Sequence, residues 1–323
     1  MRLLTAKAST KAFNIALLCA TLFCAMTSAP LRAQTVDDGV MMPRHELFFG
    51  NIYTHDSWDE YWEGHLQRSN GNLGTVSTQS DSWYADYGVT NRLNVIVNLP
   101  YVWTNASQGV LSGMGGFQDV NLAAKYKLLE RPVTKYGSLS VIGVVSGNIP
   151  LTNYEPDFQP LSIGNQSKRI AARLTLNYQT RRGWFGNASS AWTWRSDVTL
   201  DRPYYYTNGQ FYLTNQVSMP QVFDYVVSAG WLKHGRMAEA FFTQQRTQGG
   251  GDIRRQDAPF ISNHINFSKV GTAVMLPLPI RKLHNMSVQF AFSYVVDGRN
   301  VGQSTNVSTG LMYTLHLPGS PVQ

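Results

Sequence analysis

The stretch that precedes residue 72 holds the side chains whose types and spacing come nearest to catalytic chemistry. His65, Ser69 and Asn70 are the residue types of a serine hydrolase, in which a histidine accepts the proton of the serine hydroxyl. That transfer requires hydrogen-bond contact, but residues four apart in an extended strand are separated by about 13 Å. A polar loop is therefore the favoured interpretation of this stretch, and a hydrolase is the alternative.

Four carboxylates of the same stretch could offer oxygen ligands to Ca²⁺: Asp56, Asp59, Glu60 and Glu63. No glycine-punctuated loop of the EF-hand type accompanies them, so a solvated acidic loop is the favoured interpretation. The seven histidines show no pair at metal-ligand spacing, and the glycine cluster 113–116 lacks the Lys-Ser/Thr of a phosphate loop. We therefore predict no metal, no cofactor and no catalytic residue.

The composition indicates which elements must position these residues. The 323 residues are 43% apolar and 12% aromatic but only 15% charged, with a mean hydropathy of −0.21. About 25% charged residues is usual for soluble domains. A disordered chain would carry more charge and fewer aromatics, and a helical membrane protein would show several apolar runs of about 20 residues. The composition instead suits strands that are apolar on one face and wet on the other.

The first 33 residues have the layout of a secretory signal peptide, with basic residues, the uncharged run 13–26 and a small residue at Ala33. A membrane anchor is the alternative. We expect residues 34–323 to form one mature domain. Removal of four basic and no acidic residues lowers the net charge from +7 to +3, so the high pI does not indicate a nucleic-acid partner. Cys19 and Cys24 leave with the signal, which excludes thiol chemistry in the mature chain.

Apolar and polar residues alternate with the period of two that is typical of strands. In 306–317, for example, Val307, Leu311 and Leu315 share one face. Twelve ranges show the pattern: 46–56, 79–87, 93–103, 119–128, 137–148, 170–180, 184–195, 222–232, 236–247, 261–275, 286–296 and 306–317.

Short and long gaps alternate between these ranges, as in up-and-down barrels of the bacterial outer membrane. Because lipid offers no hydrogen bonds, a sheet within it must close on itself. The sequence therefore predicts an all-β transmembrane barrel of about twelve strands, with ten or fourteen as alternatives and with both termini in the periplasm. Aromatic residues near the strand ends would form interfacial girdles: Trp83, Tyr101, Trp103, Trp184, Trp192, Trp194 and Trp231.

Two segments resemble a known family. Residues 87–101 (YGVTNRLNVIVNLPY) and 116–128 (GFQDVNLAAKYKL) are similar to motifs of the phenol-degradation MetA-like outer-membrane family. The resemblance implies a barrel and a passage for aromatic or hydrophobic compounds, and it supplies no catalytic residues. Residues 308–315 resemble the signal that the barrel-assembly machinery reads, although the chain continues to Gln323. His65, Ser69 and Asn70 loosely resemble the site of outer-membrane phospholipases, where His and Ser lie two residues apart.

If the apolar faces contact lipid, the opposite positions line the lumen. The charged candidates there are Asp119, Lys125, Lys127, Arg173, Arg195, Asp224, Glu239 and Arg246. Positive charges exceed negative ones, which favours a weak preference for anions. The alternative is a plugged barrel in which inward charges pair with one another.

Two long gaps carry further candidates: Tyr204, Tyr205 and Tyr206 in one, and Arg254 and Arg255 in the other. They could form a lid that collects solute. The alternative is a self-packed loop whose arginines bind lipopolysaccharide phosphates. Together these features predict an outer-membrane channel or porin for small, hydrophobic or aromatic solutes. A lipid hydrolase and a plugged structural barrel are the alternatives.

Overall fold

The structure is a computed structural model that describes residues 35–207, 209–254, 263–280, 283 and 285–321. The predicted signal peptide (residues 1–33), with Cys19 and Cys24, lies outside the described residues, as does the loop candidate Arg255. Among the described residues, no helix is long and apolar enough to cross a membrane.

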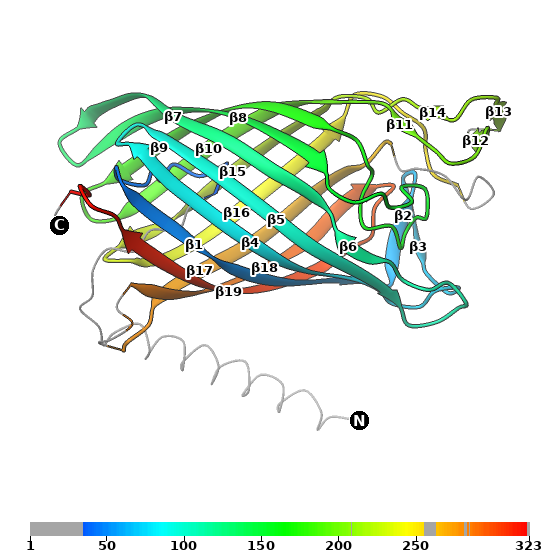
Figure 1. Cartoon of the computed structure of the whole chain (residues 1–323), viewed down its shortest axis with the longest axis horizontal. Coiled ribbons are helices and arrows are strands. Elements are labelled where there is room, and N and C mark those ends of the chain that lie inside the picture. Colours follow the sequence, from blue (N-terminus) through cyan, green and yellow to red (C-terminus); the bar gives the residue numbers. More distant parts are fainter. Residues whose placement is uncertain (1–34, 208, 255–262, 281–282, 284, 322–323) are drawn as a thin grey trace, which may run out of the picture.

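Twelve antiparallel strands form a closed wall (Figure 1): β1 (Glu46–Trp58), β4 (Val76–Thr90), β5 (Leu93–Ala106), β7 (Asp119–Thr134), β8 (Gly137–Pro150), β9 (Arg169–Thr180), β10 (Trp184–Arg195), β15 (Val222–Lys233), β16 (Arg236–Thr247), β17 (Asn266–Pro277), β18 (Met286–Arg299) and β19 (Thr305–His316). Each pairs with its neighbours along the chain, and β1 closes the barrel on β19 from Glu46↔His316 to Ser57↔Thr305. The predicted barrel and its strand number are confirmed.

Seven short strands lie in the connections: β2 (Glu60–Glu63), β3 (Leu66–Ser69), β6 (Gly115–Phe117), β11 (Val198–Thr199), β12 (Tyr205–Thr207), β13 (Gln210–Tyr212) and β14 (Gln216–Val217). β6 extends the wall beside β5, and the other six form three separate hairpin-like pairs. All seven lie in connections at one end of the barrel (Figure 1). These additions had no sequence signal because their alternating runs are only two to four residues long.

The two faces of the wall differ as the alternation predicts. Large apolar side chains that point outward are exposed, among them Val145 (60%), Ile170 (61%) and Phe290 (53%), whereas the inward Ile96 and Ile142 are buried. An exposed apolar surface that encircles a closed sheet is unfavourable in water and suits lipid. The barrel is therefore a membrane-spanning one, and this architecture places it in the bacterial outer membrane.

Connections at one end of the barrel are short, and both ends of the wall lie there, at Glu46 and His316 (Figure 1). The turn between β15 and β16 has two residues, His234 and Gly235, both with positive φ, which matches the twist of a tight hairpin. In outer-membrane barrels the end with short turns faces the periplasm. The long connections, which include 59–75, 151–168 and 196–221, form the extracellular end.

Replacement of the lipid-facing Val145 by Arg should destabilise the barrel. Val145 lies in the middle of β8 and is 60% exposed, so the guanidinium would stand in hydrocarbon. We expect the free energy of unfolding in phospholipid vesicles, measured by urea titration, to fall by about 2–4 kcal/mol. Val145→Leu, which adds volume without charge, should leave it nearly unchanged. Equal stability of the two variants would contradict a lipid-facing position.

Candidate functional site

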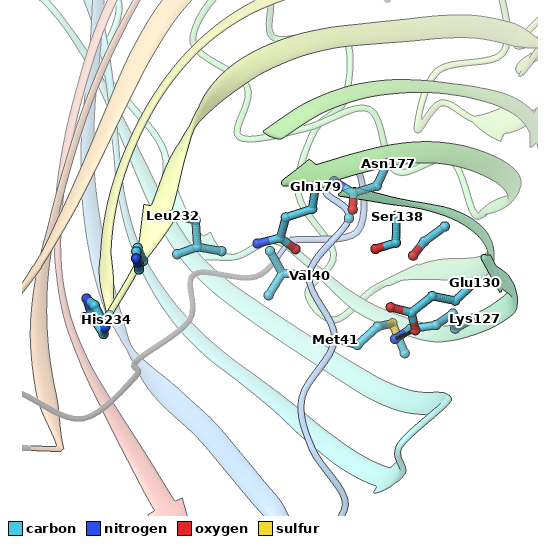
Figure 2. A pocket seen from close by; sticks show the side chains of 13 residues that line it. Val40, Met41, Lys127, Glu130, Ser138, Asn177, Gln179, Leu232 and His234 are labelled. Atoms are coloured by element: carbon cyan, nitrogen blue, oxygen red, sulfur yellow. Dashed lines mark hydrogen bonds and ion pairs between the residues drawn. The ribbon is translucent and has the colours of Figure 1, made fainter. Parts of the chain in front are cut away.

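Residues 35–42, here named the inner segment, lie inside the barrel (Figure 2). Met41 and Met42 are only 5% and 2% exposed. Met41 packs with Ile142 of β8 and other wall residues, and Met42 packs with Phe48 of β1 and its neighbours. The segment makes no strand pairing with the wall, so its position depends on side-chain contacts. The sequence analysis did not predict this placement.

Two glycines allow the inner segment to approach the wall closely. A Cβ on Gly39 would stand within 2.2–2.4 Å of the Asn177 side chain on β9. A Cβ on Gly88 of β4 would stand 2.0 Å from the carbonyl oxygen of Pro43, which links the segment to β1. Neither distance leaves room for a side chain, so both positions require glycine.

Lys125 of β7 is the main polar anchor of the inner segment. Its side chain is fully buried, and its Nζ donates to Asp38 Oδ1 at 2.6 Å and to the carbonyl oxygen of Thr35 at 2.8 Å. Asp38 also accepts a hydrogen bond from the amide of Val40. A buried ammonium is tolerated only when it is paired and hydrogen-bonded. The segment therefore supplies the carboxylate that contacts this buried cation directly.

Most of the other predicted lumen charges also have partners in the structure. Arg173 Nη2 contacts Asp224 Oδ1 at 2.6 Å across β10. Asp119 pairs with Arg169 at 2.7 Å, and Lys127 pairs with Glu130 at 2.8 Å. Arg195 donates to the carbonyl oxygens of Pro220 and Asn263. These contacts correspond to the alternative in which inward charges pair with one another.

The predicted lumen position of Arg246 is wrong. Glu239 lines a lumen pocket, and a residue seven positions further along a regular strand points to the opposite face. Arg246 faces Phe223 in the strand register. Phe223 packs against Trp192, a ring that is 37% exposed on the outer wall. The same period-two count would have added the inward residues Asp86 and Lys269, which the sequence analysis missed.

Two pockets lie on either side of the inner segment, and Val40 lines both. One, of about 370 Å³, opens at the periplasmic end and has a mostly polar lining that includes Ser138, Asn177 and Gln179 (Figure 2). The other, of about 330 Å³, lies deeper, against β10 and β15 to β18. Its apolar lining includes Phe185, Val226, Met237, Phe241, Ala273 and Ala291. The inner segment therefore separates the deeper pocket from the periplasmic mouth.

The connection 151–168 covers part of the opposite end of the lumen. Tyr154 and Ile163 pack against the inward Val102 of β5. The Thr104 hydroxyl donates to the carbonyl oxygen of Leu161, which is fully buried. An ion pair between Asp157 and Arg202 at 2.8 Å joins this connection to the next long one. This connection is thus a packed cover over part of the extracellular end.

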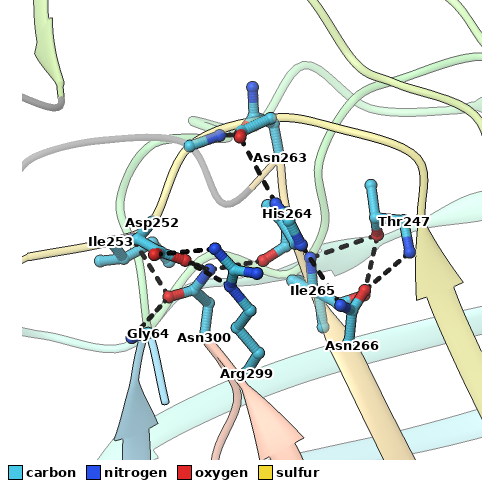
Figure 3. A network of polar contacts seen from close by, with 12 residues as sticks. Gly64, Thr247, Asp252, Ile253, Asn263, His264, Ile265, Asn266, Arg299 and Asn300 are labelled. Carbon is cyan, nitrogen blue, oxygen red and sulfur yellow. Dashed lines mark hydrogen bonds and ion pairs between the residues drawn. The ribbon is translucent and has the colours of Figure 1, made fainter. Parts of the chain in front are cut away.

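A polar network joins three other extracellular connections (Figure 3). Arg299 contacts both carboxylate oxygens of Asp252, at 2.7 and 2.9 Å. Asn300 donates to Asp252 and to the carbonyl oxygen of His264, and it accepts from the amide of Gly64. The hydrogen bonds from Arg299 lower the pKa of Asp252 to about 2. Burial lowers the pKa of His264 below its usual value.

The tyrosine candidates pack on one another within a loop. The Tyr205 and Tyr212 rings stack at 5.0 Å with an interplanar angle of 6°, and Tyr206 contacts Phe211 at 5.1 Å. Tyr205 also belongs to a small loop core with Val198, Leu200, Val217 and Met219. Tyr204 is half exposed, and Arg254 is exposed. A role as a solute-collecting lid stays a prediction.

The hydrolase candidates do not meet. His65 lies in the turn between β2 and β3, whereas Ser69 ends β3 and pairs with Glu60 at the base of that hairpin. Of the neighbouring carboxylates, Glu63 contacts Arg68, and Glu60 accepts from Gln67. Within the described part of the chain, no three His, Cys, Asp or Glu residues gather as a metal site would require.

Asp252→Asn should loosen the extracellular network in a pH-dependent way. The folded pKa of Asp252 is about 2, below the ordinary 3.8, so its contribution is present above pH 4 and disappears as the pH falls through 2. We expect the free energy of unfolding to fall by about 1–2 kcal/mol at pH 7, after allowance for solvent screening of the Asp252–Arg299 pair. A nitroxide on Arg254→Cys should be more mobile in the variant than in wild type at pH 7, and this difference should shrink as the pH falls through 2. A constant difference would contradict this account.

Asp38→Asn should release the inner segment. Removal of one partner from a buried ion pair costs about 3–5 kcal/mol, and release of the segment restores water to Lys125. The maleimide labelling rate of a cysteine at Val36 should therefore rise. Asp37→Asn is the matched control because the Asp37 carboxylate contacts only the nearby Thr35 hydroxyl among its described hydrogen bonds. The charge swap Asp38→Lys with Lys125→Asp should restore slow labelling. Equal rates in Asp38→Asn and Asp37→Asn would refute the anchor.

Models of known protein families and sequences of curated proteins give no match to this chain. Among solved structures, the chain resembles the COG4313 outer membrane channel from Pseudomonas putida F1, with a TM-score of 0.67 and 12% identity over 88% of this chain and 100% of that chain. The TodX ΔS2S3 mutant monoaromatic hydrocarbon channel superposes with a TM-score of only 0.45 (8% identity, 90% and 96% covered), which is too loose for an argument. The first similarity shows that the chain has the fold of an outer-membrane barrel.

Proposed function

We propose that this protein is a passive outer-membrane channel for small aromatic or hydrophobic molecules, closed by its inner segment. The observation that carries the proposal is the deeper pocket of about 330 Å³ between that segment and the wall. A cavity of about 150 Å³ already accommodates benzene. The pocket is therefore large enough for a substituted single ring.

The lining of the deeper pocket suits such a solute. Phe185 and Phe241 offer ring faces, and Met237 is a side chain that adapts to irregular shapes. Polar groups line it as well, and they can orient a hydroxyl: Asp37 and Asp38 of the inner segment, and Asn187, Ser228, Glu239, Thr243, Lys269 and Gln289 of the wall. Small-molecule sites combine apolar surfaces with polar groups that fix the orientation of the ligand, and this pocket offers both.

Passage requires the inner segment to move, because it lies between this pocket and the periplasmic mouth. Burial of Met41 and Met42 stabilises its position by roughly 2 kcal/mol for each side chain, and the Asp38–Lys125 pair adds to this. No backbone ladder has to break when it leaves. Departure of Asp38 would also remove the carboxylate that contacts Lys125, and this loss of one negative charge from the lumen supports a weak preference for anions in the open form.

The resemblance of residues 87–101 and 116–128 to the phenol-degradation MetA-like family agrees with this proposal. The similar fold from Pseudomonas putida F1 is also described as an outer membrane channel. We further propose that the barrel-assembly machinery recognises β19 and that the exposed Arg254 contacts lipopolysaccharide phosphates.

Deletion of residues 35–42 tests the proposed function. In liposomes with refolded protein, the variant should admit a phenol faster than wild type does, and its single-channel conductance should rise with a shift toward anions. Empty liposomes are the reference because phenols cross bare lipid, and a small sugar reports on size alone. Met41→Leu with Met42→Leu, which conserves apolar volume, should behave as wild type.

The outcome of the deletion also distinguishes a channel from a structural barrel. A channel predicts flux above the empty-liposome reference, with the phenol ahead of the sugar. Flux equal to that reference for all solutes, in a variant that is folded by its heat-modifiable electrophoretic mobility, would contradict the proposal and favour the plugged structural barrel.

A further inference from the structure

A second concave site lies outside the lumen, on the periplasmic rim of the barrel. It is formed by the turns β7–β8 and β9–β10 and is lined by Lys135, Tyr136, Thr180, Arg181, Arg182 and Trp184, here named the rim site. Its volume is about 690 Å³. None of these residues takes part in the lumen contacts or in the extracellular network described above.

The backbone of the rim site is fixed by hydrogen bonds that leave its cationic side chains free. The amide of Arg181 donates to the carbonyl oxygen of Tyr136 at 2.9 Å, which joins the two turns. The indole of Trp231 donates to the carbonyl oxygen of Arg182 at 3.0 Å. Gly183 closes the second turn with a φ of 97°, which favours glycine. The cations are therefore held close together by rigid turns.

The three cations of the rim site have no carboxylate partner within the described part of the chain. Lys135 lies over the Tyr136 ring at 4.9 Å, and no ion pair of Lys135, Arg181 or Arg182 is found there. Elsewhere at the periplasmic end, Lys127 pairs with Glu130, whereas Arg92 and Lys233 are exposed cations at other turns. Three uncompensated positive charges in one concave site favour an anion, and guanidinium groups suit phosphate oxygens.

The position of the rim site indicates where that anion resides. Tyr136 and Trp184 are both 62% exposed at the barrel end, as aromatic residues at a membrane interface are. Apolar side chains of the same strands continue from there over the outer wall, among them Val133 on β7 and Leu174 and Leu176 on β9. A ligand that fits has a phosphate at the interface and hydrocarbon chains above it.

We propose that the rim site binds one anionic phospholipid of the periplasmic leaflet. Its phosphate lies among Lys135, Arg181 and Arg182, and its acyl chains lie along Trp184 and the apolar wall. The lipid would hold this side of the barrel at a defined depth in the membrane. The proposal does not depend on transport through the lumen.

Native mass spectrometry of the detergent-solubilised, folded protein tests the site. Phosphatidylglycerol, phosphatidylcholine and inorganic phosphate are titrated separately. Arg181→Ala with Arg182→Ala should weaken phosphatidylglycerol binding by roughly 30-fold, since each basic residue contributes about fivefold at an anionic surface. The charge-matched control Arg92→Ala with Lys168→Ala removes two exposed cations elsewhere and should bind phosphatidylglycerol as wild type does.

Four results would overturn the proposal. Phosphatidylglycerol binding could be unchanged in the Arg181→Ala, Arg182→Ala variant, or it could fall equally in the control. Phosphatidylcholine could bind as tightly, which would indicate a site for acyl chains alone. Inorganic phosphate could displace phosphatidylglycerol at equal concentration, which would indicate a site for free phosphate. Trp184→Leu should also shorten lipid retention without abolishing it, because the lost ring contributes contact area and no charge.

Discussion

One constraint governs this structure: within lipid, every backbone amide and carbonyl must find a hydrogen-bond partner in the sheet itself. The pairing of β1 with β19 meets it by removing the last open edge, and closure then gives the wall two unlike faces. Apolar residues such as Val145 and Ile170 take the lipid side, so polar and charged residues are confined to a narrow lumen. The remaining features of the protein follow from how that confined charge is compensated.

Inside the wall, compensation comes from several parts of the chain. Arg173 and Asp224 belong to the wall itself, whereas Lys125 obtains its carboxylate from Asp38 of the inner segment. The inner segment therefore lies in the lumen without pairing with any strand of the wall. It can close the periplasmic mouth and leave it without unfolding a strand. The extracellular cover differs, because Asp252, Arg299 and Asn300 fasten it through a network that stays ionised down to strong acid.

Period-two alternation was sufficient to predict the wall, because each strand meets lipid on one face regardless of its partners. The same rule, applied strictly, would have corrected Arg246 and identified Asp86. It could not predict the inner segment, since residues 35–42 do not alternate and their polar anchor, Lys125, lies 87 residues from Asp38 in the sequence. Alternation also could not predict the ion pair between Asp252 and Arg299, which are 47 residues apart in the sequence. The substrate preference rests on a pocket that several distant strands build together.

The most direct test of this account is the single-channel conductance of wild type and of the variant that lacks residues 35–42, recorded in the same planar bilayer. The account predicts a low conductance in wild type and a larger, mildly anion-preferring conductance in the variant, because removal of the segment opens the mouth and leaves Lys125 without Asp38. An unchanged conductance and unchanged ion preference in the folded variant would show that the inner segment does not close the lumen.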